Sequence, residues 1–127
     1  MITCDGNNAI TESNLDPQLL NEPGLRTMIG LRERALRLPR ITFNSDYFLL
    51  YTHDGTWCEL RISAGRMTVA QGGPRHVWAA IEQAWREWER FGRPGPERYG
   101  VTVTSDGLHK FWIDHPEQAV YTDPFPT

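Results

Sequence analysis

Residues Gly73–Gly92 read GPRHVWAAIEQAWREWERFG, and this stretch decides the fold. Gly73 suits the N-cap of a helix, Pro74 its first position, and Gly92 the left-handed position after its last turn. Apolar residues recur between these ends at the spacing of one helical face: Val77, Trp78, Ile81, Ala84, Trp85, Trp88 and Phe91. Because so broad an aromatic face has to be buried, the rest of the chain must supply the surface that covers it.

The segments on either side of this helix predict that surface. Residues with an apolar period near two, separated by turns such as Asp54-Gly55 and Asp106-Gly107, predict strands at Tyr47–Thr52, Trp57–Ile62, Met67–Ala70, Tyr99–Thr104 and Leu108–Asp114. A shorter helix is predicted over Leu25–Leu36, and Gly30 in its interior indicates a close packing contact. We therefore predict an α+β fold, in which an antiparallel sheet of about five strands in two hairpin groups packs against the long Trp-rich helix and the shorter N-terminal helix.

The domain organisation follows from length and local composition. The chain has 127 residues, which is enough for one core. Residues 1–14 are mostly small and polar, so we expect a flexible N-terminal arm. Residues 15–116 are predicted to form a single α+β domain, and the proline-containing residues 117–127 an extended C-terminal tail.

Charge and cysteine content narrow the classes of partner. Thirteen basic against 16 acidic residues give a formal net charge of −3, which argues against a nucleic-acid partner and against an anionic membrane surface. The longest apolar runs are far below the ~18 residues of a membrane span. Cys4 and Cys58 are far apart and belong to no cysteine framework, so we expect free thiols and a cytoplasmic location.

The sequence contains no fingerprint of a cofactor or metal site. Gly72-Gly73-Pro74 lacks the spacing of a dinucleotide-binding loop, and the P-loop pattern is absent. The four histidines lack the companions of a zinc site. We therefore predict that the protein needs neither a cofactor nor a metal.

One candidate chemistry is acid–base catalysis. It requires a histidine and a carboxylate to meet in a cleft, where burial tunes their pKa values. The residues available for such a pair are His53, His76, His109, Asp54 and Glu59. Under this alternative the chain is a small cofactor-independent enzyme, such as a cyclase, an isomerase or a dehydratase.

The other candidate chemistry is binding. Arginines bracket a proline-rich loop after the long helix, and aromatic residues exceed what a core of this size needs. The ligand-binding candidates are Trp57, Trp88, Arg93, Arg98, Tyr99 and Trp112. They predict a groove between the long helix and the sheet for a peptide or an apolar small molecule. A third alternative is a scaffold protein or homo-oligomer, such as a homodimer, whose exposed tryptophans form its interface.

Several segments together resemble a known family. These are LDPQLL and PGLRTMIGLR, then YTHDGTW at residues 51–57, then QGGPRHVWAAIEQAWREWERFGRPGPERYGVTVTSDGLHKFWIDHP. They are similar to the C-terminal accessory domain of actinobacterial protein-L-isoaspartate-type methyltransferases, which occur beside ATP-grasp ligases in the biosynthesis of ribosomally made, modified peptides. The resemblance covers roughly residues 15–116, and the stretch from GRPGPERYGVTVTSDG to Trp112 is its most specific part.

The resemblance implies a supporting role and no methyl transfer. The family binds S-adenosylmethionine in a separate Rossmann-like domain, and this chain has neither the length nor the glycine-rich strand–loop–helix for one. The C-terminal domain of such enzymes is implicated in engaging the peptide substrate. Our leading hypothesis is therefore a stand-alone, non-catalytic module of actinobacterial natural-product biosynthesis, a part of secondary metabolism, which binds a substrate peptide beside a partner biosynthetic enzyme.

Overall fold

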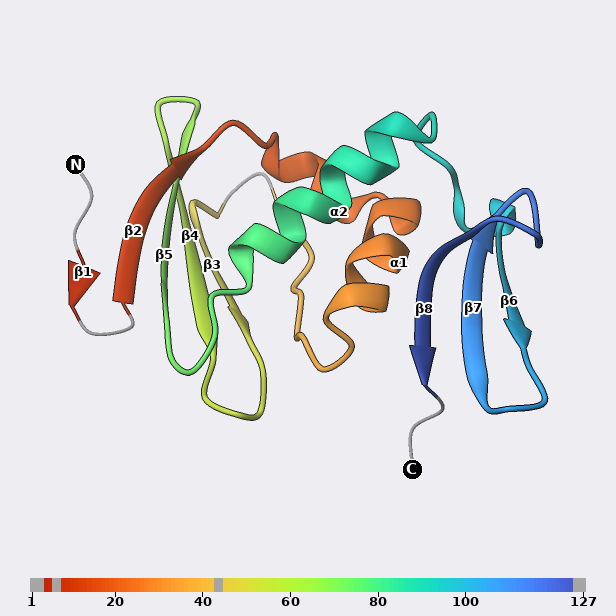
Figure 1. The fold of residues 1–127 in the computed structure, drawn as a ribbon. Coiled ribbons are helices and arrows are strands. Elements are labelled where there is room, and N and C mark those ends of the chain that lie inside the picture. Colours follow the sequence, from red (N-terminus) through yellow and green to blue (C-terminus); the bar gives the residue numbers. More distant parts are fainter. Residues whose placement is uncertain (1–3, 6–7, 43–44, 125–127) are drawn as a thin grey trace.

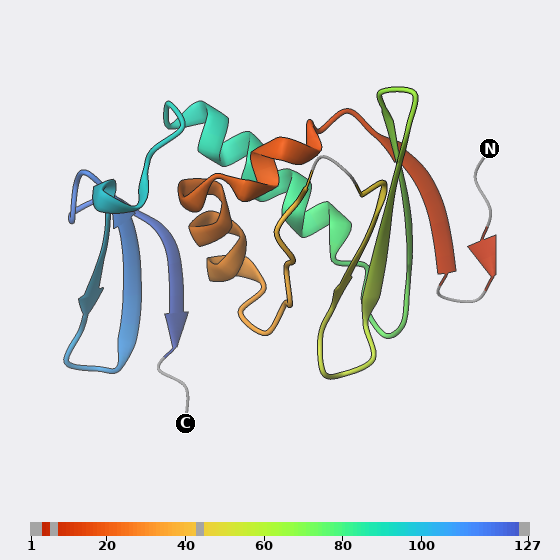
Figure 2. The same ribbon diagram turned by 180° about the vertical axis from the view of Figure 1, so that it is seen from behind.

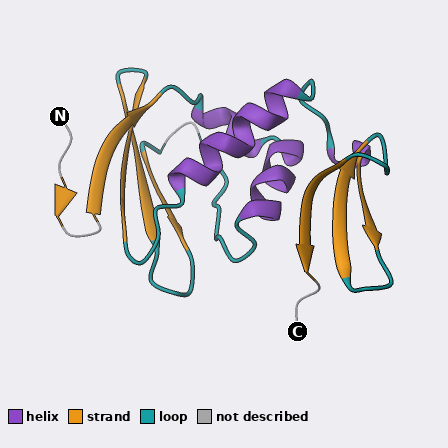
Figure 3. Cartoon of the chain, in the orientation of Figure 1, coloured by secondary structure: helices purple, strands orange, loops and turns teal. Residues whose placement is uncertain are grey.

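Two antiparallel sheets lie on either side of a pair of helices (Figures 1 and 3). This computed structural model describes residues 4–5, 8–42 and 45–124. The strands of the first sheet are β1 (Cys4–Asp5), β2 (Asn8–Ser13), β3 (Tyr47–Tyr51), β4 (Trp57–Ser63) and β5 (Arg66–Gly72). The helices are the 3-10 helix η1 (Pro17–Asn21), α1 (Pro23–Arg32) and α2 (Trp78–Arg90). The remainder contains η2 (Pro96–Arg98), β6 (Tyr99–Val103), β7 (Leu108–Ile113) and β8 (Ala119–Pro124).

The predicted α+β class is confirmed, with a different arrangement of strands. The two hairpin groups form two separate sheets, ordered β1-β2-β5-β4-β3 and β6-β7-β8, where the sequence indicated one sheet. A single sheet was expected because the predicted strands come before and after one long helix, and both hairpin groups need an apolar cover. The structure meets that need by placing the helices between the sheets, so that one layer of helices serves both groups (Figure 1).

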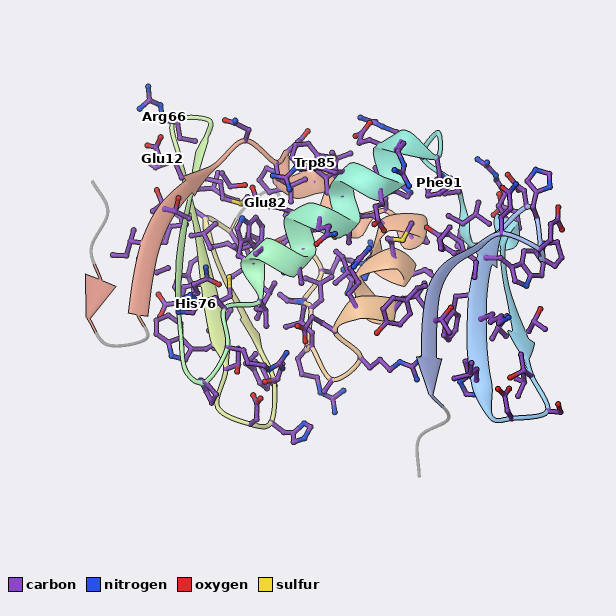
Figure 4. All side chains as sticks on the ribbon, viewed as in Figure 1. Glu12, Arg66, His76, Glu82, Trp85 and Phe91 are labelled. Carbon is purple, nitrogen blue, oxygen red and sulfur yellow. The ribbon has the colours of Figure 1, made fainter. Side chains whose placement is uncertain are left out.

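The core lies between α2 and the inner face of the first sheet. Alternate residues of the central strands are buried there, among them Phe48, Leu50, Cys58, Leu60 and Val69. The apolar face of α2 supplies Trp78, Ile81, Ala84 and Trp88 to the same cluster. Trp85 of α2 and Phe91, the residue after its last turn, are only half-buried, and both are labelled in Figure 4. Burying one large apolar side chain contributes about 1.5–3 kcal/mol, so this interface dominates the stability of the fold.

The C-terminal end of α2 agrees with the prediction, and its N-terminal end does not. The helix begins at Trp78, four residues later than Pro74, and the Trp78 N–H donates to Gln71 Oε1 of β5 at 3.1 Å. Gly73 has φ +90° and lies against the β3–β4 turn, where a Cβ would be 2.3 Å from the Gly55 carbonyl oxygen. The predicted role of Gly73 as N-cap is therefore wrong. The N-cap is Val77, and Gly73 instead allows the backbone to approach the β3–β4 turn closely. The predicted C-terminal role of Gly92, with φ +82°, is confirmed.

Helix α1 is shorter than predicted and makes its close contact at another glycine. It ends at Arg32, and the Glu33 carboxylate binds the guanidinium of Arg75, with both N···O distances 2.7 Å. Nothing lies within 4 Å of a Cβ built on Gly30, so the predicted contact there is wrong. A Cβ on Gly24 would instead be 1.8 Å from the Pro94 carbonyl oxygen. The approach of the helix to another backbone therefore occurs at its first turn.

Both terminal segments contribute strands. Asn8–Ser13 pairs with β5 from Ala9↔Gln71 to Ser13↔Met67, so the prediction of a flexible arm over residues 1–14 is wrong for this part. Ala119–Pro124 pairs with β7, so most of the predicted tail over 117–127 belongs to the second sheet. Backbone pairing needs no apolar side chains, which explains why composition missed both strands. Residues 1–3, 6–7 and 125–127 lie outside the described part of the chain.

Candidate functional site

The outer face of the first sheet exposes large apolar side chains. Tyr47, Leu49 and Tyr51 alternate with the buried residues of β3 and are 42%, 42% and 49% exposed. The register places them directly opposite Arg61, Glu59 and Trp57 of β4. On the same face, two strands further along, Ile10 is 36% exposed. Aromatic and aliphatic surface is therefore concentrated on the face of the sheet that lies opposite α2.

Arg61 extends across this outer face. Its guanidinium carbon lies 4.9 Å from the centre of the Tyr47 ring, and its Nη2 is 3.5 Å from Glu59 Oε2. A cation over an aromatic face restricts the orientation of the ring. Tyr47 is therefore held in place while it remains exposed.

Strand β3 is the edge of the sheet and has unused pairing capacity. The Thr52 N–H donates to Thr56 O and the Ile62 N–H to Asp46 O, so even-numbered residues of β3 bond to β4 and odd-numbered ones face away from it. On that outer side, the Arg37 N–H donates to Tyr51 O at 2.7 Å. Pro39, two residues further along, has no N–H with which to continue the ladder. Within the described chain, the outward backbone groups of Leu49 therefore have no partner.

A groove runs beside this edge. A cavity of about 470 Å³ lies where α1, residues 36–39 and β3 meet, and an adjoining hollow of about 400 Å³ reaches His53. The two share Arg34, Leu36, Arg37 and Tyr51, so we treat them as one site, the β3 groove. Figure 2 shows α1, the following loop and β3 next to one another. The groove joins the outer face of the sheet, because Leu49 and Tyr51 belong to both.

The walls of the groove are fixed by arginine contacts. Arg26 donates from Nη1 to Leu20 O at 2.9 Å and to Pro39 O at 3.2 Å, and from Nη2 to Leu38 O. These bonds hold residues 38–39 against α1. Desolvation lowers the pKa of the Arg26 guanidinium, and the positive charge of Arg40 lowers it further. The groove is therefore bordered by a partly buried cation that has a second cation nearby.

A second contact closes the end of the groove near the β3–β4 turn. Arg75 binds the Glu33 carboxylate through Nη1 and Asp54 Oδ2 through Nε at 3.2 Å. The Thr52 hydroxyl donates to the Asp54 carboxylate, and with the Thr56 N–H it holds the pKa of that carboxyl below its usual range. Glu33, a groove-lining residue, thus already has a cationic partner.

The predicted catalytic residues come from separate places. His53 and Asp54 lie in the β3–β4 turn, His76 in the loop before α2, and His109 on β7 of the second sheet (Figure 4 labels His76). Glu59 points from β4 to the outer face and contacts Arg61. His109 packs edge-on against Phe111, with ring centres 6.1 Å apart. The described residues therefore do not bring the three histidines into one cleft with these carboxylates.

Four of the six predicted ligand-binding residues do meet, at the end of α2. Trp88 Nε1 donates to Pro94 O at 3.0 Å, and the Tyr99 hydroxyl to Gly24 O at 2.8 Å. Arg93 binds Glu89, and its guanidinium carbon lies 5.3 Å from the centre of the Trp88 ring. Arg98 binds Asp114 through Nε and Nη2 and also donates to Phe91 O. Their polar groups are thus used within the chain, and the cluster joins the helices to the second sheet.

The other two predicted ligand-binding residues lie on different sheets. Trp57 is half-buried on the outer face of the first sheet, opposite Tyr51. Trp112 lies over Gly100 of β6, where a Cβ would be 2.1 Å from Trp112 Cζ2, and its Nε1 donates to Thr102 Oγ1 at 3.1 Å. Only Trp57 belongs to the surface beside the β3 groove.

Another hollow, of about 690 Å³, lies between β2, η1 and the β4–β5 turn. It is larger than either of the two hollows that make up the β3 groove, but its lining residues include no aromatic side chain and carry both signs of charge, through Glu12, Asp16 and Arg66. Glu12 and Arg66 lie 3.9 Å apart across it (Figure 4). The β3 groove combines aromatic surface, free backbone groups and cationic side chains, so we take it as the candidate site.

Sequence reasoning missed the residues of the groove itself. Arg34, Arg37 and Leu49 were not among the predicted ligand-binding residues, although Leu49 lies in a segment predicted as a strand. The usable signal was alternation in Tyr47–Tyr51, which gives one face two tyrosines and a leucine. The sequence predicted a strand with at least one buried face, and it did not indicate that the face with Tyr47, Leu49 and Tyr51 is left uncovered.

The comparisons with known proteins give no family. The chain matches no family model, no curated protein and no solved structure. In the part of the chain that the structure describes, no group of three or more His, Cys, Asp or Glu residues could hold a metal ion. No helix of the described residues is both long and apolar enough to cross a membrane.

Proposed function

We propose that the chain is a non-catalytic module that binds an extended peptide in the β3 groove. The observation that carries the proposal is an edge strand whose outward side chains, Tyr47, Leu49 and Tyr51, are all more than 40% exposed. Natural proteins usually protect such an edge with charges, prolines or a covering segment, and here the segment that contains Arg37 and Pro39 pairs with β3 only at Tyr51. An extended peptide that adds a strand to an open edge gains main-chain hydrogen bonds, and adjacent pockets select its side chains.

The geometry of the groove supports this mode of binding. Arg37 pairs with Tyr51 at one end of β3, and the outward N–H and C=O of Leu49 lie beyond that bridge. Ile29, Leu36 and Leu38 supply an apolar wall next to them. A peptide strand that pairs with Leu49 would place alternate side chains over the outer face and toward this wall.

The family resemblance supports the biological setting. The accessory domains that the sequence resembles are implicated in engaging a peptide substrate, and the proposed module would do the same in the cytoplasm, in actinobacterial natural-product biosynthesis, beside a partner enzyme that performs the chemistry. The scattered positions of His53, His76 and His109 give no specific observation that favours the enzyme alternative.

The experiment is a selection of random peptides of about ten residues, the upper length of an ordinary strand, against the immobilised chain. Selected peptides are then measured with Leu49→Ser and Tyr51→Ser, which change exposed side chains and leave the core intact. Because both residues would contact the peptide, we expect each variant to weaken binding by about tenfold, which corresponds to ~1.4 kcal/mol.

The matched control is Val103→Ser, on the edge strand β6 of the second sheet, where the side chain is 57% exposed. It should leave binding unchanged. If no peptide is selected, or if the β3 variants bind the selected peptides as well as the unchanged chain does, the proposed function is wrong.

A further inference from the structure

The β3 groove carries an excess of positive charge. Arg26 and Arg37 line it, and Arg40 is close enough to Arg26 to act on its charge. Arg34 also lines it, but its guanidinium carbon lies 5.3 Å from the centre of the Phe111 ring, so this side chain is already in contact with the second sheet. Glu33 is the only acidic residue of the lining, and the bidentate contact with Arg75 neutralises it. The chain as a whole has a formal net charge of −3, so this local excess opposes the overall balance. A cationic groove on an acidic protein favours an anionic ligand.

Arg37 is the cation best placed to meet such a ligand. Its backbone N–H is engaged with Tyr51 O, which fixes its position at the end of the open edge. Its side chain is exposed, has no partner among the described residues, and lines both hollows of the groove. Arg26, in contrast, donates to three backbone carbonyls. Arg37 therefore offers a planar guanidinium, which suits bidentate binding of a carboxylate.

We propose, resting on the function proposed above, that the bound peptide is acidic and that one of its side-chain carboxylates binds the Arg37 guanidinium. The apolar wall and the free backbone of Leu49 hold the peptide strand, and Arg37 selects its charge. On the outer face beside β3, Arg61 already contacts Glu59 and the Tyr47 ring. Arg37 has no such partner among the described residues, so it is the cation better placed to select the charge of the peptide.

The test uses three labelled peptides of about ten residues, each with leucine at alternate positions and an amidated C-terminus. The remaining positions hold glutamate, glutamine or lysine. Fluorescence anisotropy measures their affinities for the unchanged chain, for Arg37→Gln, and for Arg86→Gln as a control on an exposed site of α2. A fourth peptide, with glutamine and a free C-terminus, separates a terminal carboxylate from a side-chain carboxylate.

We expect the glutamate peptide to bind about ten- to a hundredfold more tightly than the glutamine peptide, as for a charge-assisted hydrogen bond in a partly buried site. Arg37→Gln should remove most of this preference and change the affinity for the glutamine peptide by less than about twofold. Arg86→Gln should have no effect. Salt of about 1 M, where the Debye length is ~3 Å, should weaken binding of the glutamate peptide alone.

The outcomes separate the two proposals. If the glutamine peptide binds as tightly as the glutamate peptide, or if Arg37→Gln weakens both equally, the acidic specificity is wrong and the peptide-binding function stands. If only the peptide with a free C-terminus binds, the side-chain assignment is wrong. If none of the peptides binds, both proposals fail. Circular dichroism of Arg37→Gln, whose backbone bond to Tyr51 is retained, confirms that the variant is folded.

Discussion

Gly24 lies where α1 comes closest to the loop after α2. A Cβ at this position would be 1.8 Å from Pro94 O and 3.0 Å from Trp88 Nε1. The nearer atom belongs to the backbone, so the clash could be relieved only by moving a whole segment. Gly30, six residues further along the same helix, meets nothing within 4 Å. The two glycines therefore have opposite physical roles.

Replacing each glycine by alanine tests this difference. We expect Gly24→Ala to destabilise the protein by about 1–3 kcal/mol, because it overpacks the contact between α1 and Pro94. Gly30→Ala should stabilise it by about 0.5–1 kcal/mol, because alanine loses less entropy than glycine in an open helical position. Urea unfolding of both variants measures these changes, and equal signs would contradict the assignment.

Which glycine is in contact could not be deduced from the sequence. Gly30 was the natural choice, since a glycine in a helix interior costs stability and calls for a reason. Gly24, next to Pro23, indicated a break in the chain before the helix, whereas the structure includes it in the first turn of α1. The deciding atom, Pro94 O, is remote in the chain, and no local pattern indicates it.

At the scale of elements, the two hairpins share one turn device. Thr52 and Asp54 close the β3–β4 turn, and Thr104 and Asp106 close the β6–β7 turn, in each case with the threonine hydroxyl donating to the carboxylate. In both turns, the hydrogen bond from the threonine hydroxyl is the main reason that the pKa of the carboxyl lies below its usual range. The first turn has an added contact, from Arg75 to Asp54.

The lowered pKa values predict a pH-dependent stability. A carboxyl whose pKa is lower in the folded state stabilises the fold above its unfolded pKa of about 4, and this stabilisation is lost as the pH falls toward the folded value. Asp54→Asn and Asp106→Asn should therefore be less stable than the unchanged chain near pH ~7, with the difference shrinking as the pH falls to about 2. Because of Arg75, the effect should be larger for Asp54. Urea unfolding across this pH range would refute the linkage if the differences stayed constant.

Local signals explain which elements the sequence predicted. The Asp54-Gly55 turn lies two residues before the alternating residues Trp57–Ile62, and β4 spans Trp57–Ser63. The strand Asn8–Ser13 depends instead on the free edge of β5, which lies more than 50 positions away in the sequence. The start of α2 likewise depends on Gln71 of β5. Such pairings are decided by tertiary contacts, which a single sequence does not display.

At the scale of the whole molecule, a few polar contacts attach the second sheet to the helices, in addition to the burial of Ile113 in the core. The Tyr99 hydroxyl of β6 donates to Gly24 O of α1, and Arg98 donates to Phe91 O at the end of α2. Burial raises the pKa of the Tyr99 hydroxyl to about 12. The attachment is therefore expected to persist at neutral pH and to weaken as the pH rises from about 10 toward that value.

Removing this hydroxyl should loosen one sheet and not the other. For Tyr99→Phe we expect amide hydrogen exchange in β6–β8 to accelerate by about two- to tenfold, because the variant loses one hydrogen bond worth ~0.5–1.5 kcal/mol. Exchange in β3–β5 should stay unchanged. Tyr121→Phe, in the same sheet, serves as the control. Equal acceleration in both sheets would mean that they open as one unit.

In the candidate site, too, neighbours in the sequence could be predicted and contacts between distant segments could not. The sequence places Trp88, Arg93, Arg98 and Tyr99 within a dozen positions at one helix end. It could not show that Glu89, Asp114 and backbone carbonyls already occupy their polar groups. The β3 groove combines residues from α1, a loop and an edge strand. It could not be predicted, because the sequence does not show which strand lies at the edge of the sheet.

The buried thiol of Cys58 can be used to measure how often the core of the first sheet opens to solvent. The side chain is 0% exposed in the centre of the first sheet, and burial raises its pKa to about 12. Only a thiolate that meets solvent is alkylated readily. Once Cys4 has been replaced by serine, the rate of alkylation therefore measures how often β4 separates from its cover, without a label or a denaturant. A ligand seated on β3, the neighbouring strand, would slow that reaction in proportion to its occupancy.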